Sequence, residues 1–377
     1  AVLLEQGELR VAVVSCDLLT IPESLEREVR KLLPPSTRLF LVATHTHCAP
    51  DSQALNDQMT FALPGIAKFR PDQLDWYAHR IGDGLSLLQE MPATPIATFG
   101  VDFAHVSANR GRRQGAIPDD LAVRIWAQSP NPTIATKRLW FHYAAHAVFF
   151  GPERNQTSAD WPGGAQVAID TPAVLPGAIG DVSPAAEGAT PKARIESFWA
   201  NVRFRLLDDS GAARHSADLR AQRLEWTSEP IALDAVRAHP DFAKKNGIPD
   251  GMAQSIVSRF APKRASINAF SLGKLCVVGV PGEPTAALGK RIRNAGRNLG
   301  FEWTLVVSHV NGWIGYILES DDYARGGYEA SLAFHGPETA NRIFAASLTA
   351  MKRLAQPKTQ AQASRGVKSV SGRIARQ

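Results

Sequence analysis

The sequence predicts an α/β fold with a mainly parallel or mixed β-sheet core that is flanked by helices. Three observations lead to this prediction: short apolar runs typical of buried strands recur along the chain, segments with helical periodicity lie between them, and polar side chains follow directly after several of the apolar runs. Because the carboxyl ends of parallel strands meet at one edge of a sheet, we expect the active site at that edge.

The chain opens with a strand, a helix and a second strand, which are predicted over residues 9–15, 22–33 and 39–43. This order implies a right-handed crossover between two parallel strands. Asp17 follows the first strand, and His45 and His47 follow the second. All three side chains are therefore expected near the carboxyl ends of neighbouring strands.

The same patterns continue through the rest of the chain, interrupted by more polar segments. Further helices are predicted over residues 72–91, 285–299 and 338–354. Further strands are predicted over residues 96–106, 275–280 and 303–310. Residues 207–265 are more polar, and we interpret them as an elaboration within the domain.

The composition is that of a soluble globular protein, with 44% hydrophobic and 21% charged residues in a chain of 377. We predict one large domain over residues 1–357 and a basic tail over residues 358–377, which we expect to be disordered. The tail carries five of the net six positive charges, so the body is not expected to bind nucleic acid electrostatically. A weak contact of the tail with an anionic membrane surface stays open. No apolar run approaches the roughly 20 residues of a transmembrane helix.

Cysteine chemistry is not expected to carry the function. The chain has three cysteines, Cys16, Cys48 and Cys276, and no CxxC pair, which excludes a cysteine zinc ribbon. Two of them lie in or beside predicted strands, so buried thiols are expected. Cys48, next to His47, keeps a role as ligand or nucleophile as an alternative.

The main chemical pattern is the His-x-His pair at the end of the second predicted strand. If that strand continues, His45 and His47 point to the same face, because strand side chains alternate. Two imidazoles on one face suit a divalent metal ion such as zinc. The alternative is a pair of hydrogen-bonded surface histidines.

Further candidate ligands occur later in the chain. His142 and His146 lie four residues apart in an apolar run and share a face on either a strand or a helix, with buried structural histidines as the alternative. Glu283 lies between the carboxyl end of a predicted strand and the start of a helix, which is a good position for a carboxylate ligand. Tyr316 and Tyr328 belong to a cluster of tyrosines, which can pack, hydrogen-bond or bind a metal as phenolate.

Two more segments carry side chains of chemical interest. The basic turn at residues 109–113 includes Arg110 and can hold a carboxylate, a phosphate or an oxyanion, with a solvated loop as the alternative. Ser183 follows a short apolar segment, where it is either a nucleophile or an ordinary turn residue.

Seven short motifs, taken together and in this order, resemble the neutral/alkaline non-lysosomal ceramidase family. The motifs are THTHCAP (44–50), NRGRR (109–113), AAHAV (144–148), SADWPGGA (158–165), GDVSP (180–184), PGEPTAALGKRIR (281–293) and NGWIGYILESDDYARGGYEA (311–330). They span nearly the whole chain up to about Leu354. Each motif is weak alone, and the ordered set is more specific than any one of them.

The resemblance implies a zinc-dependent amidohydrolase that hydrolyses the N-acyl amide bond of ceramide or a related N-acyl lipid with a metal-activated water. The family's ligands to one Zn²⁺ per chain correspond to His45, His146, Glu283 and Tyr316. His47 corresponds to the proton-transferring histidine, Tyr328 to a tyrosine thought to stabilise the oxyanion, and Arg110 to a substrate-facing arginine. Ser183 matches a serine once proposed as nucleophile, and we assign it a supporting role.

Other interpretations stay open at this point. The same zinc site can serve a smaller N-acyl amide or an ester, the scaffold can be a non-catalytic binding protein, or Ser183 can make it a serine hydrolase. The chain departs from the family at Trp313, where a tyrosine is usual. The family's N-terminal opening and C-terminal immunoglobulin-like domain are expected to be missing. The resemblance implies a secreted or periplasmic protein, with a cytoplasmic one left open.

Overall fold

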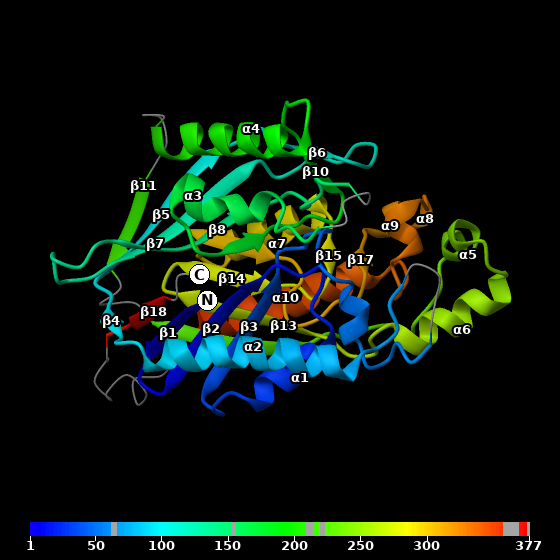
Figure 1. Cartoon of the computed structure of the whole chain (residues 1–377), viewed down its shortest axis with the longest axis horizontal. Helices are drawn as coiled ribbons and strands as arrows, with labels where there is room; N and C mark the ends of the chain where they lie inside the picture. The colour runs from blue at the N-terminus through cyan, green and yellow to red at the C-terminus, as the bar shows by residue number, and fades with distance from the viewer. Residues whose placement is uncertain (62–65, 152–155, 209–213, 219–222, 357–368, 375–377) are drawn as a thin grey trace.

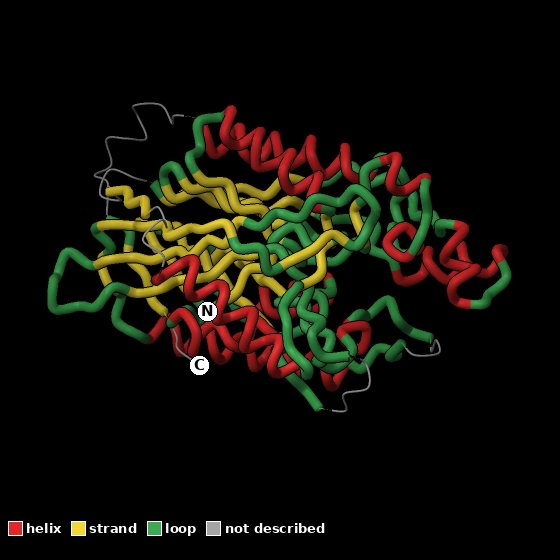
Figure 2. Tube along the Cα trace, turned by 90° about the horizontal axis from the view of Figure 1, so that it is seen from above, coloured by secondary structure: helices red, strands yellow, loops and turns green. Residues whose placement is uncertain are grey.

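The structure, a computed structural model, describes residues 1–61, 66–151, 156–208, 214–218, 223–356 and 369–374. It confirms the predicted α/β class. Within this part of the chain, three larger β-sheets pack around a shared core, and most helices lie outside them (Figures 1 and 2). Each of these sheets is mixed, because each contains one parallel pair of strands beside antiparallel ones.

The first sheet has the strand order β3–β2–β1–β18–β4. Its strands are β1 (Val2–Gln6), β2 (Leu9–Cys16), β3 (Thr37–Ala43), β4 (Thr94–Pro95) and β18 (Ser371–Ile374). Strands β2 and β3 are parallel and are joined through α1 (Glu23–Lys31), as the strand–helix–strand pattern predicted. Arg30 and Lys31 lie in the last turn of α1, where positive charge stabilises the helix C-terminus.

The second sheet has the order β11–β5–β7–β8–β9, and the third has the order β12–β13–β14–β16. The strands of the second sheet are β5 (Thr98–His105), β7 (Leu121–Gln128), β8 (Lys137–Tyr143), β9 (Val174–Pro176) and β11 (Arg214–Asp218). Those of the third are β12 (Leu224–Pro230), β13 (Ser266–Leu272), β14 (Leu275–Gly279) and β16 (Trp303–Val307). Two short pairs join β6 (Asn109–Gly111) to β10 (Val182–Pro184), and β15 (Glu283–Pro284) to β17 (Tyr316–Ile317).

Each larger sheet is covered by its own helices. Helices α1 and α2 (Pro71–Glu90) pack on the first sheet, α4 (Pro191–Arg203) on the second, and α7 (Ala286–Asn298) and α10 (Thr339–Ala355) on the third. Figure 1 shows four others near one end of the molecule: α5 (Pro240–Asn246), α6 (Asp250–Phe260), α8 (Ser320–Ala324) and α9 (Tyr328–Ser331). The remaining short helices are α3 (Ala165–Ile169), the 3₁₀ turns η1 (Ser52–Leu55) and η2 (Trp161–Gly164), and the π turn η3 (Phe204–Asp208).

Strand β3 shows how the layers share the core. Phe40 and Val42 point into the core between the three sheets, whereas Leu39 and Leu41 pack against α1 and α2. All four side chains are fully buried, which explains why this strand is an uninterrupted apolar run in the sequence. Polar residues can therefore follow only where the strand ends, and the candidate site begins there.

The predicted strands and helices are confirmed in kind, and their ends differ by a few residues. The patterns missed β1, β7, β13 and α4. Arg124 interrupts the apolar pattern of β7, yet it is buried, because its guanidinium is paired with Asp102 at 2.6 Å. Residues 207–265 contribute β12 to the third sheet and also form α5 and α6.

The prediction that the basic tail is disordered is wrong for the part of the tail that the structure describes. Residues 371–374 form β18, which pairs with β1 and β4, and Val370 is buried in the shared core. The physical reason is that β1 would otherwise present an open sheet edge beside apolar residues. Arg373 also forms an ion pair with Glu5. The other tail residues, 358–368 and 375–377, lie outside the described residues.

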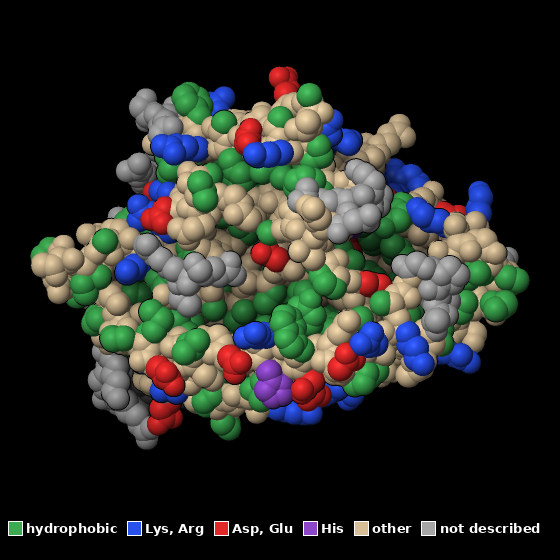
Figure 3. All heavy atoms as spheres, viewed as in Figure 1, with side chains coloured by type: hydrophobic (Ala, Val, Ile, Leu, Met, Phe, Trp, Pro, Cys, Tyr) green, Lys and Arg blue, Asp and Glu red, His purple; other side chains and the backbone are tan. Residues whose placement is uncertain are grey.

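The surface carries both signs of charge. Figure 3 shows acidic and basic side chains interspersed along the edge of the molecule where Figure 1 places α1 and α2. None of the helices in the described ranges is long and apolar enough to cross a membrane. Cys48 and Cys276 are buried and Cys16 is partly buried, as expected for packing residues.

We predict that removing residues 370–377 lowers the free energy of unfolding by at least about 1.5–3 kcal/mol, because Val370 alone buries a whole apolar side chain. A truncation that removes only residues 375–377 is the control and should leave the free energy unchanged. Urea unfolding followed by circular dichroism measures both. Equal stability of the two truncated chains would contradict the role of β18.

Candidate metal centre

His45 and His47 lie side by side, although not for the reason that the sequence suggested. Strand β3 ends at Ala43, and His45 has a φ of 64°, in the left-handed region that non-glycine residues rarely adopt. The chain therefore turns at His45. Its Nδ1 lies 2.7 Å from the Leu19 carbonyl oxygen, which can only accept, so Nδ1 carries the hydrogen and Nε2 has the lone pair. The Nε2 atoms of His45 and His47 are 3.2 Å apart.

His146 is oriented in the same way. It follows β8, and its Nδ1 lies 2.9 Å from the carbonyl oxygen of Val182, so its Nε2 also carries the lone pair. This Nε2 is 3.3 Å from Oε2 of Glu283, and the ring centroid is 4.6 Å from that of His45. A carbonyl bound to one ring nitrogen is the usual way in which a protein orients a metal-binding histidine.

Glu283 is held at the start of α7. Asp181 caps that helix by accepting a hydrogen bond from the Ala286 N–H at 2.8 Å, which fixes the turn that carries Glu283. The Trp313 Nε1–H donates to Oε1 of Glu283 at 2.9 Å. The other oxygen, Oε2, faces the histidines and lies 3.5 Å from Nε2 of His45.

Tyr316 is the neighbour of Glu283 across a short strand pair. Strands β15 and β17 run in parallel, with Glu283 and Tyr316 in register. The Tyr316 ring is buried, and its hydroxyl oxygen lies 3.5 Å from Nη2 of Arg112. Tyr316 lines the same cavity as His45, His47 and Glu283. Its role as a ligand stays a prediction.

His309 is a member of this cluster that the sequence analysis missed. It stacks on His45 with ring centroids 4.2 Å apart, and it is fully buried. Neither of its ring nitrogens has a hydrogen-bond partner among the described residues. Like His45, it has a left-handed φ, of 57°. The predicted strand over residues 303–310 hid it, because β16 ends at Val307 and His309 therefore follows a strand end like the other candidates.

Burial controls the protonation of the centre. It lowers the pKa of His45 to about 4, and it also lowers the pKa values of His47, His146 and His309. Burial opposes ionisation of Glu283, whereas a proton on His45 or His146 favours it, and the pKa of this carboxyl lies well below its ordinary value. The carboxyl and the rings thus compete for few protons, and no lysine or arginine among the described residues forms an ion pair with Glu283.

This arrangement fits a divalent cation. The ligand atoms of His45, His47 and His146 lie within 4.8 Å of one another, and so do those of His45, Glu283 and His309. Nε2 of His146, Oε2 of Glu283 and both nitrogens of His309 are buried without hydrogen-bond partners in the described part of the chain. Buried polar atoms are normally paired, so this cluster calls for a positively charged group between them. Neutral imidazoles with a carboxylate are a donor set that suits zinc.

The other predicted site residues divide between two cavities. Tyr328 lines the cavity of the centre, with its ring centroid 5.8 Å from that of Tyr316. Arg110 and Ser183 are register partners in the β6–β10 pair, and both line a separate cavity that contains none of the candidate ligands. Arg112, two residues further on, is the arginine that reaches Tyr316.

His45, His47, Glu283 and Tyr316 line a cavity of about 380 Å³. Its walls are largely apolar and include side chains from α6 and α5. The apolar lining residues are Met59, Ile66, Phe242, Phe260, Trp313, Leu332 and Phe334. Tyr328 is 44% exposed, and the Lys245 ammonium lies 3.7 Å from the centroid of its ring. The cavity thus joins an apolar chamber to a buried polar end.

The fold and the centre together define an α/β protein with a buried histidine–carboxylate cluster at the carboxyl ends of its strands. Among solved structures, the chain is similar to neutral ceramidase from Pseudomonas aeruginosa, with a TM-score of 0.73 and 16% identity over 92% of this chain and 66% of that chain. It is also similar to a ceramidase complexed with C2, with a TM-score of 0.72 and 15% identity over 92% of this chain and 67% of that one. The chain therefore has a neutral ceramidase-like fold, as the ordered motifs predicted, and spans about two thirds of the length of these structures. No protein-family model and no curated protein matches it.

We predict that His309→Leu weakens zinc binding roughly 10–100-fold, the range for residues that support a metal site. If His309 only packed against His45, leucine would be neutral or stabilising, because it removes two unpartnered nitrogens. Competition with a chelator of known affinity measures the dissociation constant, and thermal unfolding measures stability. His105→Gln, which changes an exposed histidine paired with Asp120, is the control and should leave zinc binding unchanged.

Proposed function

We propose that the protein is a metal-dependent hydrolase that cleaves the N-acyl amide bond of ceramide or a related N-acyl lipid. The observation that carries this proposal is the convergence of buried, unpartnered ligand atoms of His146, Glu283 and His309 beside His45. This cluster lies at the base of an apolar cavity that can receive an acyl chain. The likeness in fold to structures of neutral ceramidase supports the same reaction class.

The chain's own donor atoms would hold one zinc ion. The proposed ligands are His45, His146, Glu283 and Tyr316, with His309 as a further donor. Bound zinc supplies a water of lowered pKa and an electrophile for the substrate carbonyl. The remaining tasks, which are moving a proton and holding the carbonyl oxygen, fall to residues around the cluster.

His47 is our candidate for proton transfer. Its Nε2 lies 3.2 Å from that of His45, and it is the exposed member of the histidine group, on the cavity wall where a substrate enters. Burial and the neighbouring His45 lower its pKa to about 3, so its ring is neutral at pH 7. In the proposed reaction, His47 takes a proton from water and returns it to the leaving amine.

Tyr328 is our candidate for stabilising the carbonyl oxygen. Burial raises the pKa of Tyr328, so its hydroxyl stays protonated and can donate a hydrogen bond. An arginine is the second candidate for this role. The sequence resemblance suggests Arg110, whereas the contact with Tyr316 favours Arg112. Nε of Arg112 also lies 3.4 Å from a carboxylate oxygen of Glu329. Donors aimed at the developing negative charge lower the barrier of amide hydrolysis. We assign Ser183 a supporting role in the β6–β10 pair.

A smaller N-acyl substrate is the second candidate, and the size of the cavity favours it. At about 380 Å³, the cavity is at the low end of the roughly 300–1,000 Å³ typical of pockets for drug-sized ligands. A long acyl chain would therefore extend out past Tyr328 into solvent or a lipid surface. Short acyl chains would fit inside.

The test is hydrolysis of a panel of N-acyl substrates by the purified protein, from short N-acyl amines to long-chain ceramides. We expect zinc near one equivalent per chain, loss of hydrolysis on chelation, and recovery on adding zinc back. His47→Ala should lower kcat about 10²–10⁴-fold, because general acid–base catalysis contributes that much. The same variant should keep its zinc.

The outcomes of this test separate the alternatives. Preference for short soluble acyl groups would replace ceramide by the smaller substrate. Hydrolysis that survives complete metal removal would favour a serine hydrolase using Ser183. A zinc-loaded protein that cleaves none of the panel would favour a binding protein, and loss of zinc in the His47→Ala variant would contradict the role of His47.

We predict that Arg112→Gln lowers kcat/KM at least about tenfold, the effect of losing one charge-assisted hydrogen bond. Arg110→Gln should change it less than twofold, because Arg110 is exposed and lines the other cavity. Arg112→Lys keeps the charge but not the planar group, so partial activity is expected. If kcat/KM fell more in Arg110→Gln than in Arg112→Gln, Arg110 would be the substrate-facing arginine, as the sequence motif predicted.

A further inference from the structure

One side chain of the cavity wall, Trp313, contacts the carboxylate of the metal centre directly. Its indole Nε1–H donates a hydrogen bond to Oε1 of Glu283 at 2.9 Å. An indole nitrogen is a donor only, so it holds this oxygen without competing for a metal ion. The other oxygen, Oε2, has no hydrogen-bond partner in the described ranges, and it faces His45 and His146. The two oxygens of the carboxylate therefore have different surroundings.

The backbone fixes Trp313 relative to Glu283 from both sides. Ile314, the residue after the tryptophan, donates its N–H to the Pro281 carbonyl at 2.8 Å. Glu283 in turn donates its own N–H to the Gly315 carbonyl at 3.0 Å. These two bonds join the segments that carry the indole and the carboxylate, so neither segment can shift without leaving buried backbone groups unpaired. The contact between the two side chains is therefore built into the local fold.

The ring of Trp313 is also oriented by packing. It meets Phe334 edge to face, with ring centroids 5.8 Å apart and an interplanar angle of 79°. Phe260 packs on the same phenylalanine, with centroids 5.3 Å apart. Edge-to-face contacts are a favourable arrangement of aromatic rings. Trp313 thus combines a hydrogen bond and a packed ring, and mutations can separate these two contributions.

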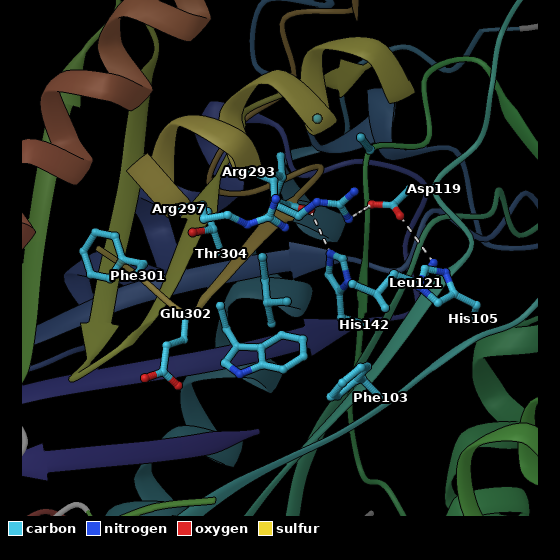
Figure 4. A pocket seen from close by; sticks show the side chains of 15 residues that line it. Phe103, His105, Asp119, Leu121, His142, Arg293, Arg297, Phe301, Glu302 and Thr304 are labelled. Carbon is cyan, nitrogen blue, oxygen red and sulfur yellow. Dashed lines mark hydrogen bonds and ion pairs between the residues drawn. The ribbon is translucent and has the colours of Figure 1, made fainter. Parts of the chain in front are cut away.

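Nitrogen atoms dominate the cluster of candidate ligands. Glu283 supplies the single carboxylate in the two ligand groups found among the described residues, and histidines supply the rest. His142, from the same apolar run as His146, does not join them. Its Nε2 lies 2.9 Å from the Val306 carbonyl oxygen, and it lines a separate cavity in which Figure 4 shows it beside Arg293. The balance between nitrogen and oxygen ligands therefore depends on whether Glu283 offers one oxygen or both.

We propose that Trp313 is a positioning residue that keeps Oε1 of Glu283 away from the metal and so favours zinc over ions that prefer more oxygen ligands. Zinc sites in proteins usually have few ligands, with histidine nitrogens common among them. Manganese and magnesium prefer octahedral sites rich in oxygen. A hydrogen bond that occupies Oε1 leaves one carboxylate oxygen for the ion, which suits zinc better. This inference rests on the metal-dependent function proposed above and adds the group that selects the metal.

The zinc and manganese affinities of the full chain and its Trp313→Phe variant test this proposal. Phenylalanine keeps an aromatic ring and loses the donor, so zinc binding should weaken roughly 10–100-fold, the range for residues that orient a metal ligand. Manganese binding should weaken less or become tighter, because Oε1 becomes available as a second oxygen. The preference for zinc over manganese should therefore fall about tenfold or more. Competition with a chelator of known affinity measures both dissociation constants.

Trp313→Gln separates the hydrogen bond from the packing of the ring. Glutamine keeps a side-chain N–H donor and loses the aromatic ring. This variant should therefore keep more of the zinc preference than Trp313→Phe, whereas a role in packing alone would reverse that order. The visible absorption of the cobalt-loaded proteins is a second measurement. Its bands should weaken in Trp313→Phe, because a second carboxylate oxygen raises the coordination number, and should weaken less in Trp313→Gln.

Trp76→Phe is the matched control. It makes the same change at a tryptophan of α2 that is 54% exposed and does not line the cavity of the centre, so both dissociation constants should stay the same. The inference alone is overturned if the protein binds zinc but Trp313→Phe leaves the preference for zinc over manganese unchanged, or if Trp313→Gln lowers that preference as much as Trp313→Phe. A wild-type protein that binds neither ion would overturn the inference together with the proposed function.

Discussion

One buried negative charge organises the functional end of this protein. Glu283 is 2% exposed, and the groups that face its Oε2 are ring nitrogens of His45 and His146 rather than a lysine or an arginine. A buried carboxylate without a positive partner would cost several kcal/mol. Trp313 satisfies only the other oxygen. A bound cation would complete the cluster, and this explains why its polar atoms are left unpartnered in an otherwise well-packed core.

The candidate ligands lie directly after the ends of strands rather than in long loops. His45 follows β3, His146 follows β8, Glu283 follows β14 within the β15 turn, and His309 follows β16. The strands themselves are rigid, because their side chains fill the shared core. Hydrogen bonds to backbone carbonyls then orient two of the rings, from Nδ1 of His45 to Leu19 and from Nδ1 of His146 to Val182. Asn311 adds a direct link between two of these strands' ends, since its side chain bonds the backbone of β3 at Leu39 and Leu41. The positions of the candidate ligands are therefore fixed by strands whose backbones are held together by packing and hydrogen bonds.

The sequence predicted the parts of this site that depend on local pattern. Apolar runs located the strands, and polar residues after them pointed to His45 and Glu283, whereas His146 lay within an apolar run and was chosen over His142 from the family resemblance. What it missed depends on details of strand ends and on tertiary contacts. His309 was hidden because the predicted strand was extended to Val310, past the true end of β16 at Val307. Asp17 lies at the carboxyl end of β2, as expected, and its carboxylate accepts a hydrogen bond from Thr44 Oγ1 at 2.9 Å, beside His45. β18 lies in a basic tail whose composition suggested disorder, and only the open edge of β1 explains its pairing. A local sequence pattern does not show which distant segments of the chain will pair.

Chemistry and substrate shape come from different parts of the chain. The candidate ligands belong to strand ends of the sheets, whereas Phe242, Asn246 and Phe260 on the cavity wall belong to α5 and α6. These helices lie in the polar segment that carried no recognisable chemistry in the sequence. Because α5 and α6 contribute nothing to the three large sheets, their side chains can change with little cost to the core or to the histidine cluster. In the proposed function, this segment should therefore determine which acyl group fits the cavity, whereas the residues at the strand ends should determine which bond is cleaved.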